Sequence, residues 1–159
     1  MKKLYQFVKK LYKFFKISFR DKMILIEAFC ITGMIRFAIL FIDFSKIVKF
    51  TGNYKEESSE YLCETERFIT KKVGWIVNTV SKNTPWESKC LVKALTAQIL
   101  LKQKNISSTL YLGVTKNKQN KLIAHAWLRS GLDIITGERE KINFTEVAKF
   151  ANHSRRKSL

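Results

Sequence analysis

Cys90 and His125 are the residues of this sequence whose types suit covalent chemistry on a carbonyl group. A cysteine thiolate is a strong nucleophile, and it needs an imidazole that accepts its proton and later returns it to the departing amine. The chain has two histidines, and His153 falls in a basic polar tail, so His125 is the better candidate for the base. Two structural alternatives stay open: Cys90 as a small buried residue, and His125 as a histidine with structural hydrogen bonds only.

The residues before Cys90 predict that it lies in the first turns of a helix. Thr84, Pro85 and Glu87 have the form of a capping box, with Thr as N-cap, Pro at the first helical position and Glu three residues after the cap. The helix then runs to about Lys104. At such a position, unsatisfied N–H groups and the positive end of the helix dipole stabilise a thiolate.

The elements around this helix predict an α+β fold. Apolar residues spaced by three, four and seven predict a helix over residues 58–82. After Asn105 the period changes, and residues 109–115, 122–129 and 132–136 read as three strands. Helices followed by a small antiparallel sheet make the class α+β. A cysteine on a helix followed by a histidine on a strand is the chain order of papain-like and transglutaminase-like folds.

The third member of a catalytic triad is the least determined part of the site. The acids that follow Cys90 are Asp133, Glu138, Glu140 and Glu146. Asp133 is the preferred candidate, with Glu138 as an alternative. A backbone carbonyl or a hydroxyl such as that of Thr136 can also hold the imidazole in the required tautomer, and the site is then a Cys–His dyad.

The expected hairpin argues against Asp133. If Ser130 and Gly131 form the turn, His125 pairs opposite Thr136, and Asp133 lies about three residues, or ~10 Å, along the strand. A register slip, a bulge or a longer loop would be needed to bring Asp133 to the ring.

An oxyanion hole needs hydrogen-bond donors near the developing negative oxygen. The backbone N–H of Cys90 is the first candidate, and Asn83 or the Trp86 indole is a candidate for the second. For Trp86 a packing role is the main alternative. Trp127 is expected to form a wall of the site or part of the core.

The N-terminal third of the chain is basic and apolar. Residues 1–20 hold seven basic side chains and no acid, and their apolar spacing predicts an amphipathic helix that lies on anionic lipid or packs on the domain. Residues 23–42 are long enough to cross a bilayer, but they contain Glu27 and Arg36, each costing ~2.5–3.5 kcal/mol at a membrane centre. We expect a buried or half-buried helix here, with spanning and interfacial placement as alternatives.

The composition limits the class of partner and the compartment. With 30 Lys and Arg against 13 Asp and Glu, the formal charge is +17, which favours an anionic partner. No zinc spacing, basic zipper or ribonucleoprotein motif is present, so nucleic acid is not expected. Three widely separated cysteines argue against a disulfide framework and indicate a reducing, cytoplasmic compartment. Isolated Cys and His residues and the lack of a nucleotide fingerprint indicate neither metal nor cofactor.

Several spaced motifs together resemble the stand-alone leader peptidase of lasso-peptide biosynthesis, a cysteine peptidase of transglutaminase-like fold. These motifs are Pro85-Trp86-x-x-x-Cys90-Leu91-x-x-Ala94-Leu95, Leu112-Gly113-Val114, His125-Ala126-Trp127-Leu128-Arg129, Thr136-Gly137 and a closing segment over residues 144–150. The resemblance covers nearly the whole chain. It implies N-terminal helices at 1–54, a catalytic domain at 55–159, and Cys90 and His125 as the catalytic pair.

The resemblance also implies partners. The substrate is the leader of a precursor peptide, presented by a separate leader-recognition (RRE) protein, because nothing in this chain leaves room for that domain. A lasso cyclase would use the freed core peptide. Two other functions stay open: an acyltransferase of the same fold, and a basic membrane-associated scaffold in which Cys90 is merely buried.

Overall fold

The computed structural model describes residues 18–138 and 143–154, so the amphipathic helix predicted within residues 1–20 lies largely outside the described residues. The helices are α2 (Phe19–Phe41), α3 (Phe44–Val48), α4 (Glu64–Ser81) and α5 (Cys90–Gln103). The strands are β1 (Asn53–Tyr54), β2 (Ser108–Lys116), β3 (Leu122–Ser130), β4 (Asp133–Thr136) and β5 (Thr145–Asn152).

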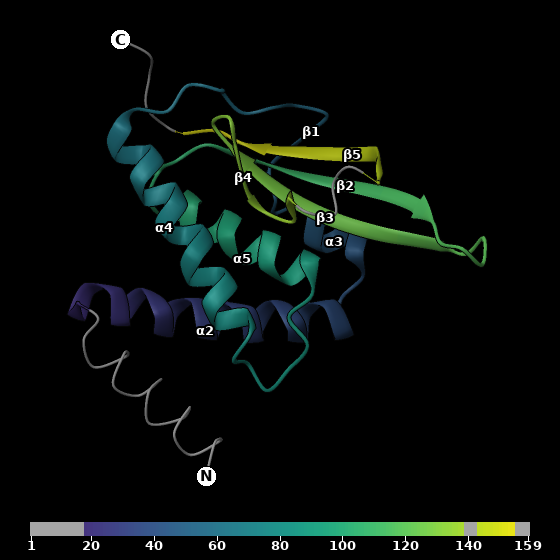
Figure 1. Ribbon diagram of the computed structural model, residues 1–159, viewed down its shortest axis with the longest axis horizontal. Helices are drawn as coiled ribbons and strands as arrows, with labels where there is room; N and C mark the ends of the chain where they lie inside the picture. The colour runs from purple at the N-terminus through teal and green to yellow at the C-terminus, as the bar shows by residue number, and fades with distance from the viewer. Residues whose placement is uncertain (1–17, 139–142, 155–159) are drawn as a thin grey trace.

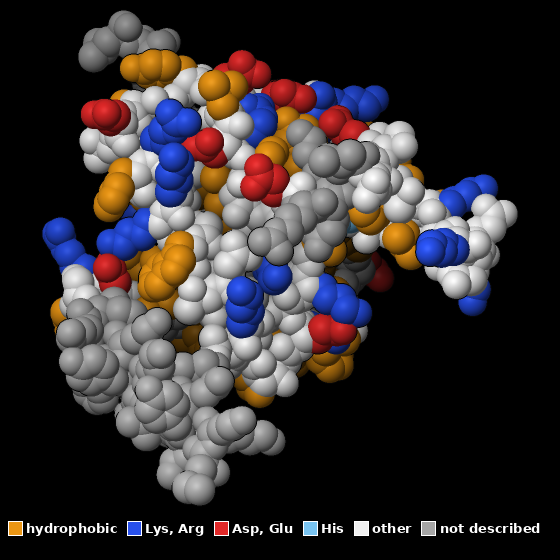
Figure 2. All heavy atoms as spheres, in the orientation of Figure 1, with side chains coloured by type: hydrophobic (Ala, Val, Ile, Leu, Met, Phe, Trp, Pro, Cys, Tyr) orange, Lys and Arg blue, Asp and Glu red, His pale blue; other side chains and the backbone are white. Residues whose placement is uncertain are grey.

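The strands form one antiparallel sheet in the order β1-β5-β2-β3-β4. The helices α2, α4 and α5 lie together on one side of this sheet (Figure 1). The predicted α+β class, helices first and a small antiparallel sheet after them, is therefore confirmed. The hairpin of β2 and β3 projects from the body, and its tip carries lysines (Figure 2).

The core lies between the helices and one face of the sheet. Period-2 alternation along β3 turns Ala126 and Leu128 toward the helices, where they pack with Leu110 of β2. The helices contribute apolar residues at spacings of three and four. These are Leu25, Ala28, Ile31 and Ile35 of α2, Val73, Ile76, Val77 and Val80 of α4, and Val92, Leu95, Leu100 and Leu101 of α5. Because α2 shares this core, it packs as part of the same unit, while the boundary at residue 54 stays a prediction.

Helix α4 begins later than the pattern predicts. The prediction was residues 58–82, and the helix runs from Glu64 to Ser81. Its N-terminus is capped at Cys63, whose backbone N–H donates to the Glu66 carboxylate at 3.1 Å. The segment before it is tied to the sheet instead, because the backbone N–H of Ser58 donates to the Thr109 hydroxyl at 2.8 Å. Tertiary bonds thus hold these residues outside the helix.

Helix α2 is half-buried, as expected for the apolar run over residues 23–42. By length and composition it is also long and apolar enough to cross a membrane. Its most apolar window is 28% buried. Its buried stripe faces α4 and α5, and the other stripe faces outward.

The turn between β3 and β4 differs from the prediction. The two-residue loop is Gly131-Leu132, not Ser130-Gly131, and Ser130 pairs with Asp133. Gly131 has φ +59°, a backbone conformation that glycine adopts without the cost of a Cβ. A bulge then shifts the register so that Thr136 pairs with Leu128, not with His125. The expected pairing of His125 with Thr136 is therefore wrong.

Candidate active site

Cys90 is the first residue of α5, and Lys89 is its N-cap. The predicted capping box at Thr84 is wrong, because residues 82–89 form turns and loop instead of a helical turn. The Thr84 hydroxyl bonds to the Trp86 carbonyl at 3.0 Å, so it caps no helix. The Glu87 carboxylate, expected to complete the box, pairs instead with Lys89 at 2.7 Å. Cys90 therefore lies closer to the helix end than the sequence suggested, in a position where the helix dipole favours a thiolate.

The loop that leads to Cys90 is held against α2. The Trp86 ring centroid lies 4.8 Å from that of Phe29, and a Cβ at Gly33 would approach the indole to 3.1 Å. Arg36 of α2 pairs with Glu87 at 3.3 Å. Gly33 thus provides the space for Trp86, and α2 supports the segment that positions the thiol.

Trp86 also contains an unusual donor. Its indole Nε1 is buried and makes no hydrogen bond within the described part of the chain. Asn83, the other candidate for an oxyanion donor, uses its side-chain amide to donate to the Thr79 carbonyl at 2.7 Å, which caps the end of α4. Of the two sequence candidates, Trp86 is the one whose donor the structure leaves without a described acceptor.

His125 lies on the face of the sheet opposite the helices. Strand alternation turns His125 and Trp127 to this face, and the two rings stack with centroids 6.1 Å apart. The Phe144 ring centroid lies 5.0 Å from that of His125. A Cβ at Gly113, which pairs with His125, would lie 2.7 Å from the Trp127 ring. The Leu112-Gly113-Val114 motif therefore makes room for the tryptophan of the histidine motif.

The backbone carbonyl of Gly137 orients the imidazole. His125 Nε2 lies 3.2 Å from this oxygen, and because a carbonyl only accepts, Nε2 carries the donated proton. In the neutral ring, Nδ1 is then the nitrogen that can take a proton. Gly137 has φ +80°, and a Cβ there would lie 2.7 Å from the Ala126 carbonyl and 2.9 Å from Nε2. Only glycine fits, which gives the Thr136-Gly137 motif a physical reason.

A backbone carbonyl was among the expected partners of the ring, but Gly137 was not predicted. The signal was present, since a glycine directly after a short strand often marks a positive φ or a close approach. The Thr136 hydroxyl, also considered, is buried without a hydrogen-bond partner in the described residues.

The structure does not place Asp133 beside His125. Asp133 pairs in register with Ser130, five residues or roughly 17 Å along β3 from the histidine. Its carboxylate is bonded to Arg67 Nε of α4 at 3.2 Å. Asp133 and Glu138 both line a cavity of about 260 Å³ between α4 and β4, which neither Cys90 nor His125 lines.

Cys90 and His125 approach β3 from different sides. Helix α5 packs on the face that carries Ala126, and half-buried Cys90 contacts the core on that side. His125 faces the other way, and within the described residues no hydrogen bond joins its ring to the Cys90 thiol. Among the described strands, β3 pairs at this point with β2, since its pairing with β4 covers Leu128 to Ser130. The two groups are thus separated by one strand at the edge of the sheet.

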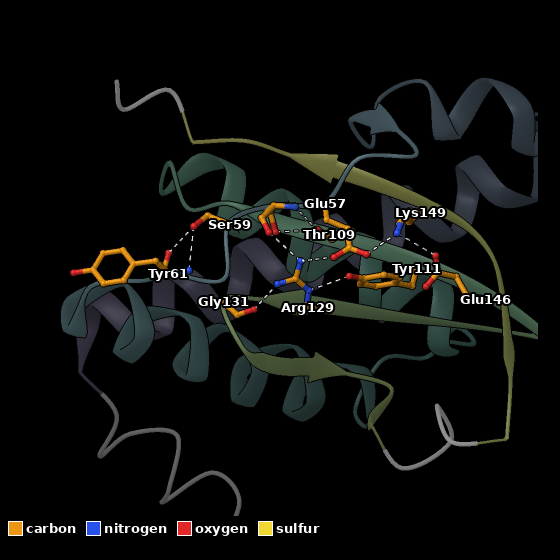
Figure 3. Close-up of polar contacts among 10 residues, drawn as sticks. Glu57, Ser59, Tyr61, Thr109, Tyr111, Arg129, Gly131, Glu146 and Lys149 are labelled. Carbon is orange, nitrogen blue, oxygen red and sulfur yellow. Dashed lines mark hydrogen bonds and ion pairs between the residues drawn. The ribbon is translucent and has the colours of Figure 1, made fainter. Parts of the chain in front are cut away.

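The same outer face carries a second polar cluster around Arg129 (Figure 3). Arg129 is buried and donates to the Tyr111 hydroxyl at 2.9 Å, to the Gly131 carbonyl at 2.6 Å and to the Ser58 carbonyl at 2.9 Å. Its Nη2 also lies 3.3 Å from the Glu57 carboxylate. These bonds attach the segment before α4 to the sheet.

The pKa values of two groups in this cluster are shifted in opposite directions. The Lys149 ammonium donates to Glu57 at 2.6 Å and lowers the pKa of that carboxyl. Burial raises the pKa of the Tyr111 hydroxyl, and the bond from Arg129 partly counters this effect. Within residues 18–138 and 143–154, no group of three or more His, Cys, Asp or Glu side chains is arranged to hold a metal ion.

Comparison with known proteins adds one finding. A sequence model of a family described as "Transglutaminase-like superfamily" matches residues 34–149, well over half of the chain. The match includes α4, α5 and most of the sheet, with Cys90, His125 and Gly137 inside it. No curated protein and no solved structure matches the chain.

Proposed function

The chain belongs to the transglutaminase-like superfamily, which includes cysteine peptidases and acyltransferases, and from this we propose that it is a cysteine peptidase. Cys90 is the nucleophile and His125 the general base and acid. The observation that carries the proposal is the position of Cys90 at the first residue of α5, combined with a superfamily that includes cysteine peptidases. A purely structural cysteine has no need of a helix N-terminus.

The reaction proceeds through a thioester. His125 takes the proton of the Cys90 thiol, and the sulfur attacks the carbonyl carbon of the scissile peptide bond. When the tetrahedral intermediate collapses, the C–N bond breaks and the imidazolium gives its proton to the departing amine. Water, deprotonated by His125, then attacks the thioester and releases a carboxylate and the free thiol.

The tautomer of His125 supports this role. With Nε2 donating to the Gly137 carbonyl, Nδ1 carries the lone pair that accepts the thiol proton. In the described structure the ring and the thiol lie on opposite faces of β3, so the proposed mechanism requires that peptide binding bring them together. The backbone N–H of Cys90 and the unpartnered Trp86 indole are the proposed oxyanion donors.

For the substrate, we propose the bond between leader and core of a lasso-peptide precursor. The support is the resemblance of the spaced motifs to the lasso leader peptidase. In this proposal a separate leader-recognition protein presents the precursor, and a cyclase acts on the freed core.

The test is a cleavage reaction followed by mass spectrometry. Purified full-length protein is mixed with a leader–core peptide and a leader-recognition protein from the same gene cluster, and with the variants Cys90→Ala and His125→Ala. We expect separate leader and core masses with the wild type and neither product with the two variants. Cys63→Ala and His153→Ala are matched controls, and we expect both to cleave normally.

The other outcomes either contradict the peptidase or point to another function. A leader joined to an added amine identifies an acyltransferase with the same cysteine. Unchanged precursor with a folded wild type bound to its partner contradicts the peptidase. If Cys90 also resists iodoacetamide at neutral pH, the scaffold function is favoured.

A further inference from the structure

Helix α2 presents a long apolar stripe to the outside of the molecule. We call it the outer stripe, and it consists of Met23, Ile26, Phe29, Met34, Phe37, Leu40 and Phe41. Apart from Phe29 and Leu40, these residues and the exposed Cys30 follow one another at spacings of three and four, so they lie on one face of the helix. Phe37 is 63% exposed and Phe41 is 71% exposed. A contiguous apolar surface of this kind marks an interaction site.

Charged side chains are few along the outer stripe, although Glu27 borders it, four residues after Met23 and three before Cys30. Between Met23 and Phe41 every exposed residue is apolar or cysteine. The charged residues in this interval are Glu27 and Arg36, both half-buried, and Arg36 is paired with Glu87. By contrast, hydrophobic, basic and acidic side chains alternate over the face shown in Figure 2.

We propose that the outer stripe docks on the surface of an anionic phospholipid bilayer. Two observations favour lipid over a protein partner. Residues 1–20, which precede and begin α2, hold seven basic side chains and no acid, and the whole chain has a charge of +17. Apolar insertion next to a basic segment is the combination that binds anionic membranes stably, since either signal alone is weak.

The helix lies along the membrane surface and does not cross it. Its opposite stripe, with Leu25, Ala28 and Ile35, belongs to the core shared with α4, α5 and the sheet. A spanning α2 would leave that core open to water. Two ion pairs also fasten the helix to the domain, from Asp21 to Lys72 and from Arg36 to Glu87. Only the outer stripe is therefore available to lipid, which fits the interfacial geometry.

The test measures binding of the full-length protein to vesicles by co-sedimentation. The vesicles contain phosphatidylcholine alone or phosphatidylcholine with phosphatidylglycerol. We expect binding to the anionic vesicles, weakened by high salt, and a loss of roughly tenfold or more in partitioning for Met34→Glu/Phe37→Glu. Both residues are exposed, so the variant should keep the wild-type circular dichroism and Tm.

Tyr61→Glu/Leu132→Glu is the matched control, because these residues are 80% and 73% exposed but lie away from α2. We expect it to bind vesicles like the wild type. Equal binding by both double variants, or no binding by the wild type, overturns the proposal. So does a wild-type dimer that Met34→Glu/Phe37→Glu converts to monomer without any lipid effect, because a second copy then covers the stripe. None of these readouts depends on peptidase activity, so this proposal and the proposed function fail separately.

Discussion

The two ends of the outer face of β3 hold polar side chains in opposite ways. At one end, Arg129 is bonded to groups from β2, from the β3–β4 turn and from the segment before α4. At the other end, the His125 ring packs beside two aromatic rings, with Nε2 3.2 Å from the Gly137 carbonyl. A buried charge needs every bond it can make, whereas a catalytic imidazole needs one nitrogen fixed and the other able to exchange a proton. The first end serves stability, and we assign the second to chemistry.

Replacing His125 by glutamine gives the largest effect on activity. His125→Gln keeps a side-chain N–H that can donate to the Gly137 carbonyl, but it removes the base. We expect cleavage to fall by roughly 10²–10⁴-fold, with a small change in the free energy of unfolding. Single-turnover cleavage and urea denaturation measure the two quantities. A variant that cleaves normally would exclude His125 as the base.

Replacing Arg129 by methionine gives the largest effect on stability. Arg129→Met leaves the buried Tyr111 hydroxyl and the Ser58 carbonyl without their donor. We expect the free energy of unfolding to fall by about 2–4 kcal/mol. Below the unfolding transition, cleavage per folded molecule should stay within about twofold of wild type. A large loss of cleavage in the folded variant would mean that the two ends of β3 are not separate.

Gly137→Ala tests the link between backbone and imidazole. The added Cβ meets the Ala126 carbonyl and His125 Nε2, and the backbone has a positive φ. We expect a loss of about 1–3 kcal/mol in stability together with a shift in the pH profile of cleavage, because the ring loses its fixed partner. Gly74→Ala is the matched control, since its Cβ meets Ile135 and touches neither the imidazole nor the loop before Cys90.

The lowered pKa of the Glu57 carboxyl predicts a moderate loss of stability in acid. Its carboxyl pKa is lowered in the folded protein, first by the bond from Lys149. A lowered folded pKa contributes stability above the unfolded value, near 4.3, and that contribution is lost as pH falls through the folded pKa. The Tm difference between wild type and Glu57→Gln should therefore shrink between about pH 6 and pH 3. A constant difference would show that the Lys149 bond does not stabilise the fold.

Asp133→Asn gives the smallest expected effect. The carboxylate forms a partly exposed pair with Arg67, which is worth about 0–1 kcal/mol. We expect a change of this size in stability and less than about threefold in cleavage, since removing a group that orients the base would cost more. A loss of a hundredfold or more would restore Asp133 as the third member of a triad.

The sequence predicted those features that depend on local pattern. The α+β class, the helix that begins near Cys90 and the strand that carries His125 all follow from periodicity and turn residues. The capping box at Thr84 failed because Glu87 pairs with Lys89 and with Arg36 of α2, and a distant pairing of the latter kind is invisible in a local pattern. The hairpin register failed because the turn lies at Gly131-Leu132, one residue later than predicted, and a bulge then displaces Thr136 by one further step along β3.

The candidate site also contains features that the local sequence pattern predicts and features that it does not. The chain offers three cysteines and two histidines, and the predicted helix start, the predicted strand and the motif resemblance select Cys90 and His125 among them. The carbonyl that orients His125 belongs to Gly137. A glycine after a short strand signals an unusual backbone conformation, but it does not show which side chain its carbonyl contacts. The face of the sheet on which His125 lies follows from alternation once the register is known, since Ala126 and Leu128 occupy the core side.

Because Gly33 makes room for Trp86, the rotation of α2 about its axis affects both the loop before Cys90 and the direction of the outer stripe. One inserted residue in this helix turns everything beyond it by about 100°. Such a turn removes the seat of the indole, separates Arg36 from Glu87 and directs the outer stripe elsewhere. An insertion or deletion in α2 therefore changes two features at once. It changes the surface that α2 exposes and the support of the loop that precedes the nucleophile.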